Sequence, residues 1–577
     1  MYQLRRFLKN YKLQLTIGPL CKLIEAIFEL LIPLITADII DTGVANNDID
    51  YVLQKGGLMI LLGALGLGFA LVCQKSASIA SQGFGTEVRN AMFKHINTLS
   101  HNEIDKIGTP SLITRMTNDI NQLQLAVAML IRLVIRAPIL VIGAVIMSMT
   151  IDLRMTIIFL TAAPLIALVL FWIMYRSVPF FKTIQKKLDC ISLISRENLS
   201  GNRVIRAFSK QESDCNRFDE KNDELARAAV TVGRISVLLN PLTYIIAQAA
   251  VIAIIWFGSG FVDSGELLPG QIIALVNYMT TILLTMIVAS NLFVIFSKAF
   301  ASAARVNEVF ETKPSVVEKT QKHIETDKNS PVIEFRDVSF AYADNGYALK
   351  EINFKIERGS TVGIIGGTGS GKSTLVNLIP RFYDTSKGNV FIDGNNVKEY
   401  SFRQLRSNMG IVPQASVLFA GTIKENIRWG KKNATDKEIL KALKISQSYD
   451  FVSKLPEKIN SVVTAGGKNL SGGQRQRLTI ARAIVSEPEI LILDDSASAL
   501  DFATDAALRK ALKEETKNMT VIMVSQRVGT VRYANQILVL DNGRLVGSGN
   551  HNDLLDTCSV YKEICLSQLK TEELRNQ

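Results

Sequence analysis

The chain has 577 residues, room for about two to four domains, and its hydrophobic content of 48% with a mean hydropathy of +0.20 is high for a soluble protein. The formal net charge of +12 could indicate nucleic-acid binding. Much of the positive excess lies beside apolar segments, where membrane topology and anionic lipid account for it, so we exclude a nucleic-acid partner.

The first half of the chain contains six candidate membrane-crossing segments. Four are uncharged runs with about the 20 residues that a bilayer-crossing helix needs, at 56–74, 155–175, 235–262 and 267–297. Two weaker segments carry charges, namely 16–43 with Lys22, Glu25 and Glu29, and 125–151 with Arg132 and Arg136. After Ala304 no comparable run occurs, so the first half predicts a multi-pass domain in a lipid bilayer.

The charges inside these segments have two interpretations. Lys22, Glu25 and Glu29 share one helical face, and ionisable residues in a membrane span face the protein interior or a cavity. The two carboxylates could attract cationic compounds, or Lys22 could neutralise Glu25 and the group could lock helix packing. We expect Arg132 and Arg136 to snorkel or to pair locally.

The loops predict the orientation in the membrane. Short connections near 44–51, 152–154 and 262–269 are mostly acidic, whereas the long connections 76–124 and 177–234 hold many Lys and Arg. The positive-inside bias then places the long loops and both termini in the cytoplasm. The long connections are polar and helix-compatible, so we expect the membrane helices to continue into them. The basic opening MYQLRRFLKNYK is typical of an amphipathic helix on the membrane surface.

The second half changes to a different pattern. Residues 311–330 are polar and predict a linker between a transmembrane domain at 1–310 and a second domain at 331–577. Short β-rich runs follow (VIEFRDVSFAY, EINFKIERG, TVGIIGG, NVFIDG), and then helical stretches alternate with strands at 489–494 and 519–525. Asn-Gly in ILVLDNGRLVG predicts a hairpin. The fold class is therefore multidomain, with an all-α six-helix transmembrane domain before an α/β P-loop nucleotide-binding domain.

The strongest local motif is GGTGSGKST, directly after the apolar run TVGII. It satisfies G-x-x-x-x-G-K-[ST] in a strand–loop–helix context, where backbone N–H groups wrap phosphate oxygens and the helix N-terminus favours negative charge. We expect Lys372 to reach the β- and γ-phosphates and Ser373 to bind Mg²⁺. The predicted phosphate-binding residues are Gly366, Gly367, Thr368, Gly369, Ser370, Gly371, Lys372, Ser373 and Thr374.

Two further motifs follow in the order that a nucleotide-hydrolysing domain would have. ILILDD is an apolar strand that ends in Asp494 and Asp495, which is a common way to present a Mg²⁺ ligand. Upstream of it, LSGGQRQRL places Ser and two Gly ahead of a helix, another terminus suited to phosphate. Its expected nucleotide contacts are Ser471, Gly472, Gly473 and Gln474.

With these motifs the chain resembles the ATP-binding cassette (ABC) half-transporters of multidrug-exporter type over essentially its whole length. GGTGSGKST is similar to the Walker A loop, ILILD to the Walker B strand, and LSGGQ to the signature that reaches across to a partner's ATP. The resemblance implies ATP and Mg²⁺ as cofactors, with Ser373, Gln414 and Asp494 as metal ligands and Tyr342 stacking on adenine. Gln414 would be the Q-loop glutamine, and SALD at 498–501 would be the D-loop.

Three positions depart from the family pattern. Asp495 stands where the family has its catalytic glutamate, Gln526 in VSQR replaces the switch histidine, and Ala465 replaces an acidic residue before the signature. Aspartate is one methylene shorter than glutamate, so its carboxylate falls about 1–1.5 Å short, and a misplacement of about 1 Å can lower a rate on the order of 10²-fold. Gln526 cannot carry the positive charge of a histidine. We therefore expect a site, with Asp495, Gln526 and Gln414 as its catalytic positions, that binds ATP and hydrolyses it poorly.

The intact signature indicates a second ABC half-transporter subunit as partner. In this family each ATP lies between the Walker motifs of one cassette and the signature of the other, so LSGGQ of this chain would complete a competent site on a different partner chain. The resemblance implies the degenerate-site subunit of a heterodimeric bacterial exporter in the cell membrane.

The sequence leaves several functions open. The leading prediction is ATP-driven export of a small amphipathic or lipophilic compound of multidrug type, with a lipid flippase or a peptide exporter as alternatives. An ATP-gated sensor or regulatory membrane protein without significant transport belongs to another class. The intact Gln414, signature and D-loop disfavour it, because they indicate a cassette still coupled to a working partner.

Overall fold

The computed structural model describes residues 3–318, 324, 327, 329–342, 346–496, 498–515 and 519–568. The chain divides into two compact units: unit 1 comprises Met1–Asn97 and Thr109–Thr312, and unit 2 comprises Thr98–Gly108 and Lys313–Gln577. Residues 98–108 thus pack with the second half of the chain, although their sequence position falls within the first. Most of 319–328, in the expected linker, lies outside the described residues.

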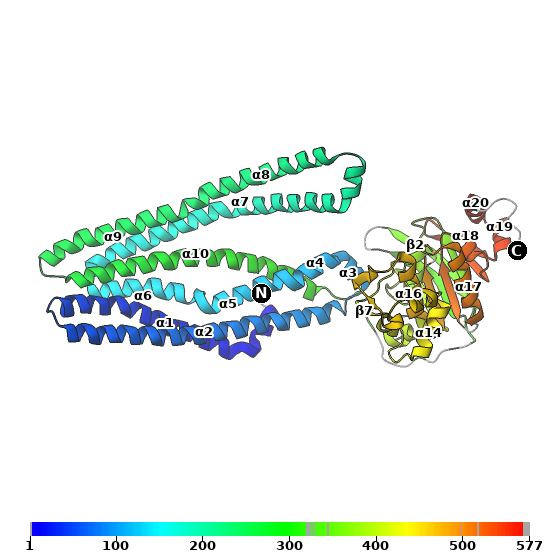
Figure 1. Cartoon of the computed structure of the whole chain (residues 1–577), viewed down its shortest axis with the longest axis horizontal. Helices are drawn as coiled ribbons and strands as arrows, with labels where there is room; N and C mark the ends of the chain where they lie inside the picture. The colour runs from blue at the N-terminus through cyan, green and yellow to red at the C-terminus, as the bar shows by residue number, and fades with distance from the viewer. Residues whose placement is uncertain are drawn as a thin grey trace. The chain divides into compact units, whose positions relative to one another are not determined.

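The described part of unit 1 is entirely helical (Figure 1). Its elements are η1 (Gln3–Tyr11), α1 (Lys12–Asp38), η2 (Ile39–Val44), α2 (Ile49–Ile96), α4 (Thr109–Thr114), η3 (Arg115–Asp119), α5 (Ile120–Met129), η4 (Leu130–Val134), α6 (Arg136–Ile151), α7 (Leu153–Ala207), α8 (Gln211–Val237), α9 (Leu239–Asp263) and α10 (Pro269–Glu311).

Five helical stretches of the described chain are long and apolar enough to cross a membrane, by length and composition: Ile49–Ile96, Thr109–Ile151, Leu153–Ser177, Gln211–Asp263 and Pro269–Glu311. The sixth expected crossing is α1, whose 27 residues would extend about 40 Å at 1.5 Å per residue. Its apolar face is interrupted by Lys22, Glu25 and Glu29, so the count of six stays a prediction.

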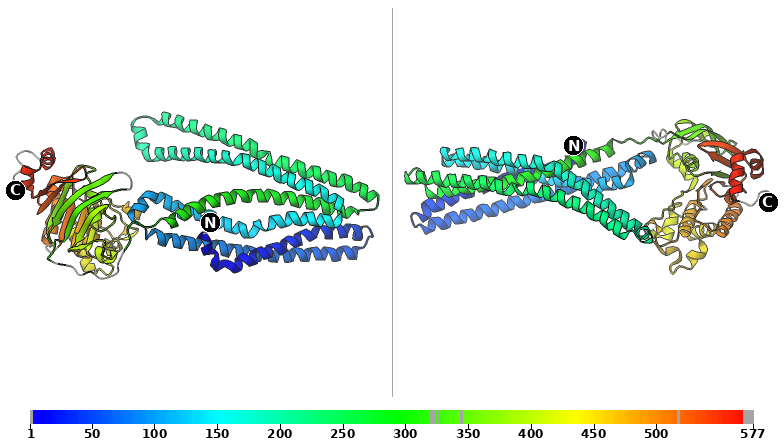
Figure 2. Two further views of the ribbon diagram at one scale, coloured as in Figure 1. Left: turned by 180° about the vertical axis from the view of Figure 1, so that it is seen from behind. Right: turned by 90° about the horizontal axis from the view of Figure 1, so that it is seen from above.

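The helices continue well beyond their apolar runs, as expected from the helix-compatible loops. α2 has 48 residues and α7 has 55, well over twice the roughly 20 residues needed to cross a bilayer. α7 begins where the Asp152 carboxylate accepts hydrogen bonds from the N–H groups of Arg154 and Met155. Beyond their apolar parts α7 and α8 run side by side as an antiparallel hairpin (Figures 1 and 2).

Unit 2 contains two larger sheets. The antiparallel sheet has the order β2 (Tyr347–Ile356), β1 (Ile333–Ala341), β4 (Lys387–Ile392), β5 (Asn395–Asn396). The second has the order β12 (Arg544–Gly549), β11 (Gln536–Asp541), β3 (Thr361–Gly366), β10 (Thr520–Val524), β9 (Ile490–Asp494), β6 (Met409–Val412). Its inner strands are parallel and buried on both faces, which explains their continuous apolar sequences. β7 (Gly421–Thr422) and β8 (Val462–Val463) form a small separate pair.

The helices of unit 2 are α3 (His101–Ile107), α11 (Lys372–Leu378), α12 (Phe402–Ser407), α13 (Ile423–Arg428), α14 (Asp436–Ile445), α15 (Tyr449–Ser453), η5 (Lys458–Asn460), η6 (Ala465–Gly467), α16 (Gly472–Ile484), α17 (Phe502–Glu515), α18 (Val528–Val531), α19 (His551–Thr557) and α20 (Ser559–Gln568). α13, α14, α15 and one face of α16 share a hydrophobic core of their own, built around residues such as Ile427, Leu443 and Leu478. They form a helical lobe beside the sheets.

Candidate nucleotide-binding site

Parallel pairing brings four predicted motifs to one edge of the six-stranded sheet. In register, Val524 of β10 lies opposite Ile364 of β3 and Asp494 of β9, and β6 pairs with β9 on the other side. The loops that follow these strands therefore emerge together at the carboxyl ends, where α/β sheets bind ligands. The loop after β3 is the Walker A loop, and β9 leads into Asp494 and Asp495. The loops after β10 and β6 carry Gln526 and Gln414.

The Walker A loop has the conformation that its glycines permit. Gly369 and Gly371 have φ of 80° and 98°, in the left-handed region, and α11 starts directly afterwards. The buried Lys372 ammonium donates hydrogen bonds to Gly366 O at 2.9 Å and Gly367 O at 2.6 Å. Burial lowers the pKa of Lys372, while the Asp495 and Asp494 carboxylates oppose that change. Phosphate oxygens would offer this ammonium stronger, charge-assisted partners than the two carbonyls.

Oxygen donors suited to a divalent cation meet beside this loop. The Ser373 hydroxyl donates a 3.1 Å hydrogen bond to Asp494 Oδ1, which joins α11 to the end of β9. Asp494 is buried, and burial raises its pKa, with the neighbouring Asp495 charge adding to the effect. A hydroxyl, a carboxylate and an amide oxygen are ligand types that Mg²⁺ accepts. Ser373, Asp494 and Gln414 therefore fit the predicted metal, although Gln414 hydrogen-bonds Asp495.

Asp495 occupies a tight turn immediately after β9. Its φ is 48°, and its N–H donates to Val524 O at 3.0 Å, so the backbone leaves the strand sharply. Burial raises the pKa of the Asp495 carboxyl, while Lys372 and Arg527 lower it. A short carboxylate bonded to Gln414 supports the expectation that this position orients water poorly.

Gln526 lies in the loop between β10 and α18 and is exposed. A residue outside the predicted motifs restrains this loop. The side-chain amide of Gln568 in α20 donates a hydrogen bond to Gln526 O at 2.8 Å and accepts one from Val528 N at 2.9 Å. The neighbouring Arg527 reaches two D-loop carbonyls, Leu500 O at 3.4 Å and Ser498 O at 3.5 Å. Gln568 belongs to no predicted motif, and the sequence analysis used only Gln526 of VSQR, so neither Gln568 nor Arg527 was identified from the sequence.

The signature residues begin α16 on the helical lobe. Ser471 and Gln474 form a capping box, with Gln474 N donating to Ser471 Oγ and Ser471 N donating to Gln474 Oε1. A Cβ at Gly472 would meet no heavy atom within 4 Å, whereas one at Gly473 would lie 3.0 Å from the D-loop oxygen Ala499 O. The helix start is therefore ordered and open at Gly472.

Tyr342 contacts the nucleotide-binding loop through its hydroxyl, which donates to Thr374 Oγ1 at 3.1 Å. Its ring packs edge-on against Phe340 and Tyr383, with centroid distances of 4.7 and 5.3 Å. Its stacking on adenine stays a prediction.

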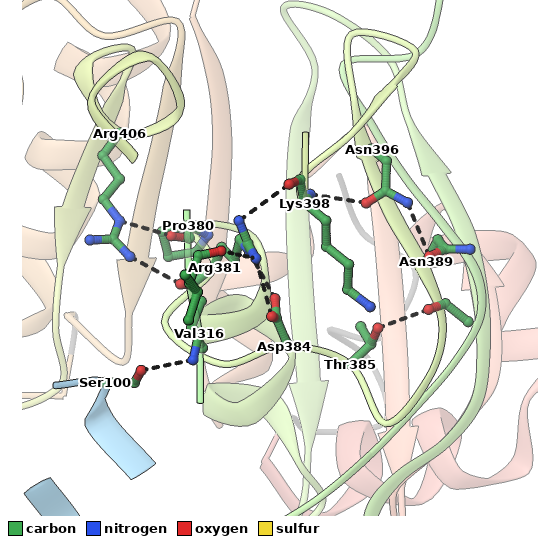
Figure 3. Close-up of polar contacts among 12 residues, drawn as sticks. Ser100, Val316, Pro380, Arg381, Asp384, Thr385, Asn389, Asn396, Lys398 and Arg406 are labelled. Carbon is green, nitrogen blue, oxygen red and sulfur yellow. Dashed lines mark hydrogen bonds and ion pairs between the residues drawn. The ribbon is translucent and has the colours of Figure 1, made fainter. Parts of the chain in front are cut away.

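Residues 98–108 dock onto the rest of unit 2 next to this aromatic group. The Tyr383 hydroxyl donates to Asp105 Oδ2 at 2.9 Å, and the His101 ring lies 4.8 Å from the Phe382 ring. The Ser100 hydroxyl oxygen accepts a hydrogen bond from Val316 N at 3.0 Å (Figure 3). This docking was not predicted from the sequence.

Two arginines, one buried and one partly exposed, hold the segment under this contact (Figure 3). Arg381 is 1% exposed and donates to both carboxylate oxygens of Asp384, at 2.8 and 3.2 Å, and to the carbonyls of Val317 and Lys398. Arg406 donates to Pro380 O and Arg381 O, both at 3.0 Å. These bonds fix the segment 380–384 that carries Phe382 and Tyr383.

Four of the charges in the membrane segments form two ion pairs. The Lys22 ammonium lies 2.7 Å from both Glu25 carboxylate oxygens, and Arg136 Nη2 donates to Glu29 at 2.7 and 3.0 Å. Each carboxylate thus has a cationic partner, which supports the packing interpretation over attraction of free cations. Arg136 pairs across helices, with a residue of α1.

Comparison with known proteins matches both units. A family model described as the ABC transporter transmembrane region matches residues 15–287, and one described as ABC transporter matches residues 349–498. An uncharacterized ABC transporter ATP-binding protein of Mycobacterium tuberculosis is 35% identical over 569 residues, which cover 98% of this chain and 97% of that protein. The uncharacterized ABC transporter ATP-binding protein YfiB of Bacillus subtilis is 36% identical over 567 residues, with 98% of each chain covered.

A solved structure of a bacterial Atm1-family ABC exporter with ATP bound superposes with a TM-score of 0.78, covering 98% of this chain and 99% of that one. At 24% identity this likeness shows a shared fold.

Proposed function

This chain belongs to the ABC transporter family, and from that premise we propose that it exports amphipathic or lipophilic compounds as one half of a heterodimer, contributing the impaired ATP site. Membership of the family implies ATP binding and exporter-type transport. Our proposal adds the heterodimer, the impaired ATP site, Mg²⁺ and the multidrug-type substrate.

The observation that carries the proposal is Asp495 at the end of β9, where the family has glutamate. The aspartate backbone is anchored to Val524 O at 3.0 Å and its carboxylate is hydrogen-bonded by Gln414, so the shorter side chain has little freedom to reach further. Gln526, in the loop after β10, supplies no positive charge. Both changes reduce water activation while leaving the phosphate loop complete.

The signature supports a working partner. Ser471 and Gln474 cap α16, and Gly472 has open space around it, as close approach to another chain's nucleotide would require. In this arrangement the intact signature completes the partner's site, and that site performs most of the turnover. The cassettes and both termini would lie on the cytoplasmic side of a cell membrane, and the bacterial relatives favour a bacterial origin.

The proposal is tested by ATPase measurements on the reconstituted full-length chain, alone and with the similar-sized protein that co-purifies from native membrane. The chain alone should show little hydrolysis, and the pair should show turnover. A turnover of roughly 1–10 per second for the chain alone, within the ordinary enzyme range, would contradict the heterodimer.

The same preparation distinguishes three other functions. A lipid flippase would show ATP-dependent transbilayer movement of labelled phospholipid, and a peptide exporter would accumulate peptide in inverted vesicles. A regulatory protein would bind ATP and form the complex without moving any of these substrates. The intact Gln414, the D-loop and the open signature favour transport over regulation alone, because they are the parts of a cassette that works with a second one.

A further inference from the structure

We propose that unit 1 contains a binding site for an amphipathic molecule with a zwitterionic head group, held between the Glu29 carboxylate and the Arg136 guanidinium. This inference rests on the proposed export function and specifies its substrate class. The head group would present an ammonium to Glu29 and a phosphate or carboxylate to Arg136.

The two charges line a cavity of about 250 Å³ between three helical segments. Its walls combine the ion pair with two hydroxyl residues and five apolar ones: Glu29, Leu133, Arg136, Ala137, Leu140, Thr281, Leu284, Thr285 and Val288. At 1.5 Å per residue, Glu29, Arg136 and Thr281 lie roughly 18–24 Å along their helices from the end of the bundle where the connecting loops are short. All three therefore lie within an apolar layer about 30 Å thick, where ionisable residues mark binding sites or pathways.

The ion pair has unused hydrogen-bonding capacity. Arg136 approaches Glu29 through Nη2 alone, at 2.7 and 3.0 Å, instead of with the two-nitrogen fork that pairs best with a carboxylate. The buried Nε of Arg136 has no hydrogen-bond partner among the described residues. The side chains keep 28% and 38% of their surface exposed, so both charged groups are accessible from the cavity.

Charge balance favours a zwitterion over a simple cation. Glu25 is already paired with Lys22, and Glu29 with Arg136, so a lone cation would have to displace Arg136 and leave its charge unpaired in a poorly solvated place. A lone anion at Arg136 would face the Glu29 carboxylate. A head group carrying both charges can insert into the pair and leave every charge with an opposite neighbour.

An apolar groove of about 590 Å³ adjoins the cavity and shares Ala137 with it. All of its lining side chains are apolar: Leu130, Val134, Ala137, Pro138, Val141, Met286, Ala289, Leu292, Phe296 and Phe300. A cavity that contains an ion pair, beside a larger apolar groove, fits one molecule with a charged head and a hydrocarbon tail. We assign the groove to the tail of that molecule.

The test measures binding to the full-length chain in maltoside micelles without ATP, by competition against radiolabelled lauroyl lysophosphatidylethanolamine. Competitors with similar tails are dodecylammonium, dodecyl phosphate and unlabelled lysophosphatidylethanolamine, and free phosphoethanolamine tests the head alone. The zwitterionic amphiphile should bind at least about tenfold more tightly than each singly charged one, as one charge-assisted contact allows. Free phosphoethanolamine should bind more weakly still.

Three variants connect this selectivity to the ion pair. In Glu29→Gln, dodecyl phosphate should bind as tightly as the zwitterionic amphiphile. In Arg136→Gln, dodecylammonium should bind as tightly as the zwitterionic amphiphile. Glu25→Gln is the matched control, because it neutralises a paired carboxylate of the same helix that does not line the cavity, and it should leave the selectivity unchanged. If a single variant fails to fold, the neutral pair Glu29→Gln with Arg136→Gln should fold and lose the preference for the zwitterion.

Equal affinity of the wild-type chain for all charged probes would overturn the assignment. So would an equal loss for every probe in both single variants together with lower thermal stability, since the pair would then only lock the helices. Because these measurements need neither ATP nor partner, charge-selective binding without export by the pair would refute the export function and leave the site standing.

Discussion

Lys372 Nζ donates a 2.6 Å hydrogen bond to the carbonyl oxygen of Gly367, so the ammonium predicted to hold phosphate is turned onto its own loop. A second bond, to Gly366 O, completes the arrangement. Nucleotide binding would exchange two neutral acceptors for charged ones, and that gain explains how a buried lysine with a lowered pKa becomes a phosphate ligand.

Lys372→Ala should weaken nucleotide affinity by well over tenfold, because charge-assisted contacts to phosphate are the strong ones. Affinity is measured on the full-length chain with a fluorescent ATP analogue. Lys432→Ala, which removes an exposed lysine from the same unit, serves as control and should bind like the wild type. Equal affinities for Lys372→Ala and the wild type would mean that the loop no longer binds nucleotide.

The Gln568 amide should control the mobility of the loop that carries Gln526. Gln568→Ala removes both hydrogen bonds, each worth about 0.5–1.5 kcal/mol, and should speed hydrogen exchange at the Val528 amide. Hydrogen–deuterium exchange of the peptide 525–531 measures this effect. Ser567→Ala, one residue earlier, removes only a bond within α20 and should leave exchange at 525–531 unchanged. The same exchange rate in both variants would show that α20 does not restrain the loop.

The Tyr383–Asp105 hydrogen bond should contribute measurably to the docking of residues 98–108. Tyr383→Phe removes the hydroxyl and keeps the ring, so it should lower the free energy of unfolding by about 0.5–3 kcal/mol, the range for bonds to neutral and charged partners. A double-mutant cycle with Asp105→Ala isolates the pair, and its coupling energy should be at least about 0.5 kcal/mol. Strictly additive effects of the two changes would mean that the bond contributes nothing.

Local patterns in the sequence predicted much of unit 2. Asn542 and Gly543 form the expected hairpin turn with φ of 46° and 77°, and the helix expected at the LSGGQ motif begins at Gly472. The long-range contacts were not predictable in the same way. Gln568 lies 42 residues from Gln526, and Asp105 lies 278 residues from Tyr383, so no periodicity or spacing connects them.

The membrane charges illustrate the same limit. The i, i+3 spacing of Lys22 and Glu25 made their pairing an expected alternative. The partner of Glu29 is Arg136, 107 residues away, and it depends on how α1 and α6 pack. Sequence identified these residues as functional candidates, while the packing decided which charge neutralises which.

The two ATP sites of the proposed heterodimer should respond differently to mutations in this chain. In this proposal Ser471 and Gly472 belong to the signature that completes the partner's site, whereas Asp495 belongs to the impaired one. Gly472→Asp should fold normally, because a Cβ there meets no atom within 4 Å, yet it would place a carboxylate against the partner-bound γ-phosphate. The ATPase activity of the co-expressed pair should fall by roughly 10²-fold, the scale on which a misplaced reacting group acts.

Asp495→Asn should change the same activity far less, because the proposed heterodimer obtains little turnover from this site. Gly472→Ala is the matched control, because it adds bulk without adding charge. It should retain more ATPase activity than Gly472→Asp. Asp495→Glu should not restore hydrolysis by itself, since Gln526 still lacks the charge of a histidine. The measurement is the ATPase rate of the reconstituted pair for each single variant. If Asp495→Asn proves as damaging as Gly472→Asp, then the site that holds Asp495 is competent and the heterodimer loses its main support.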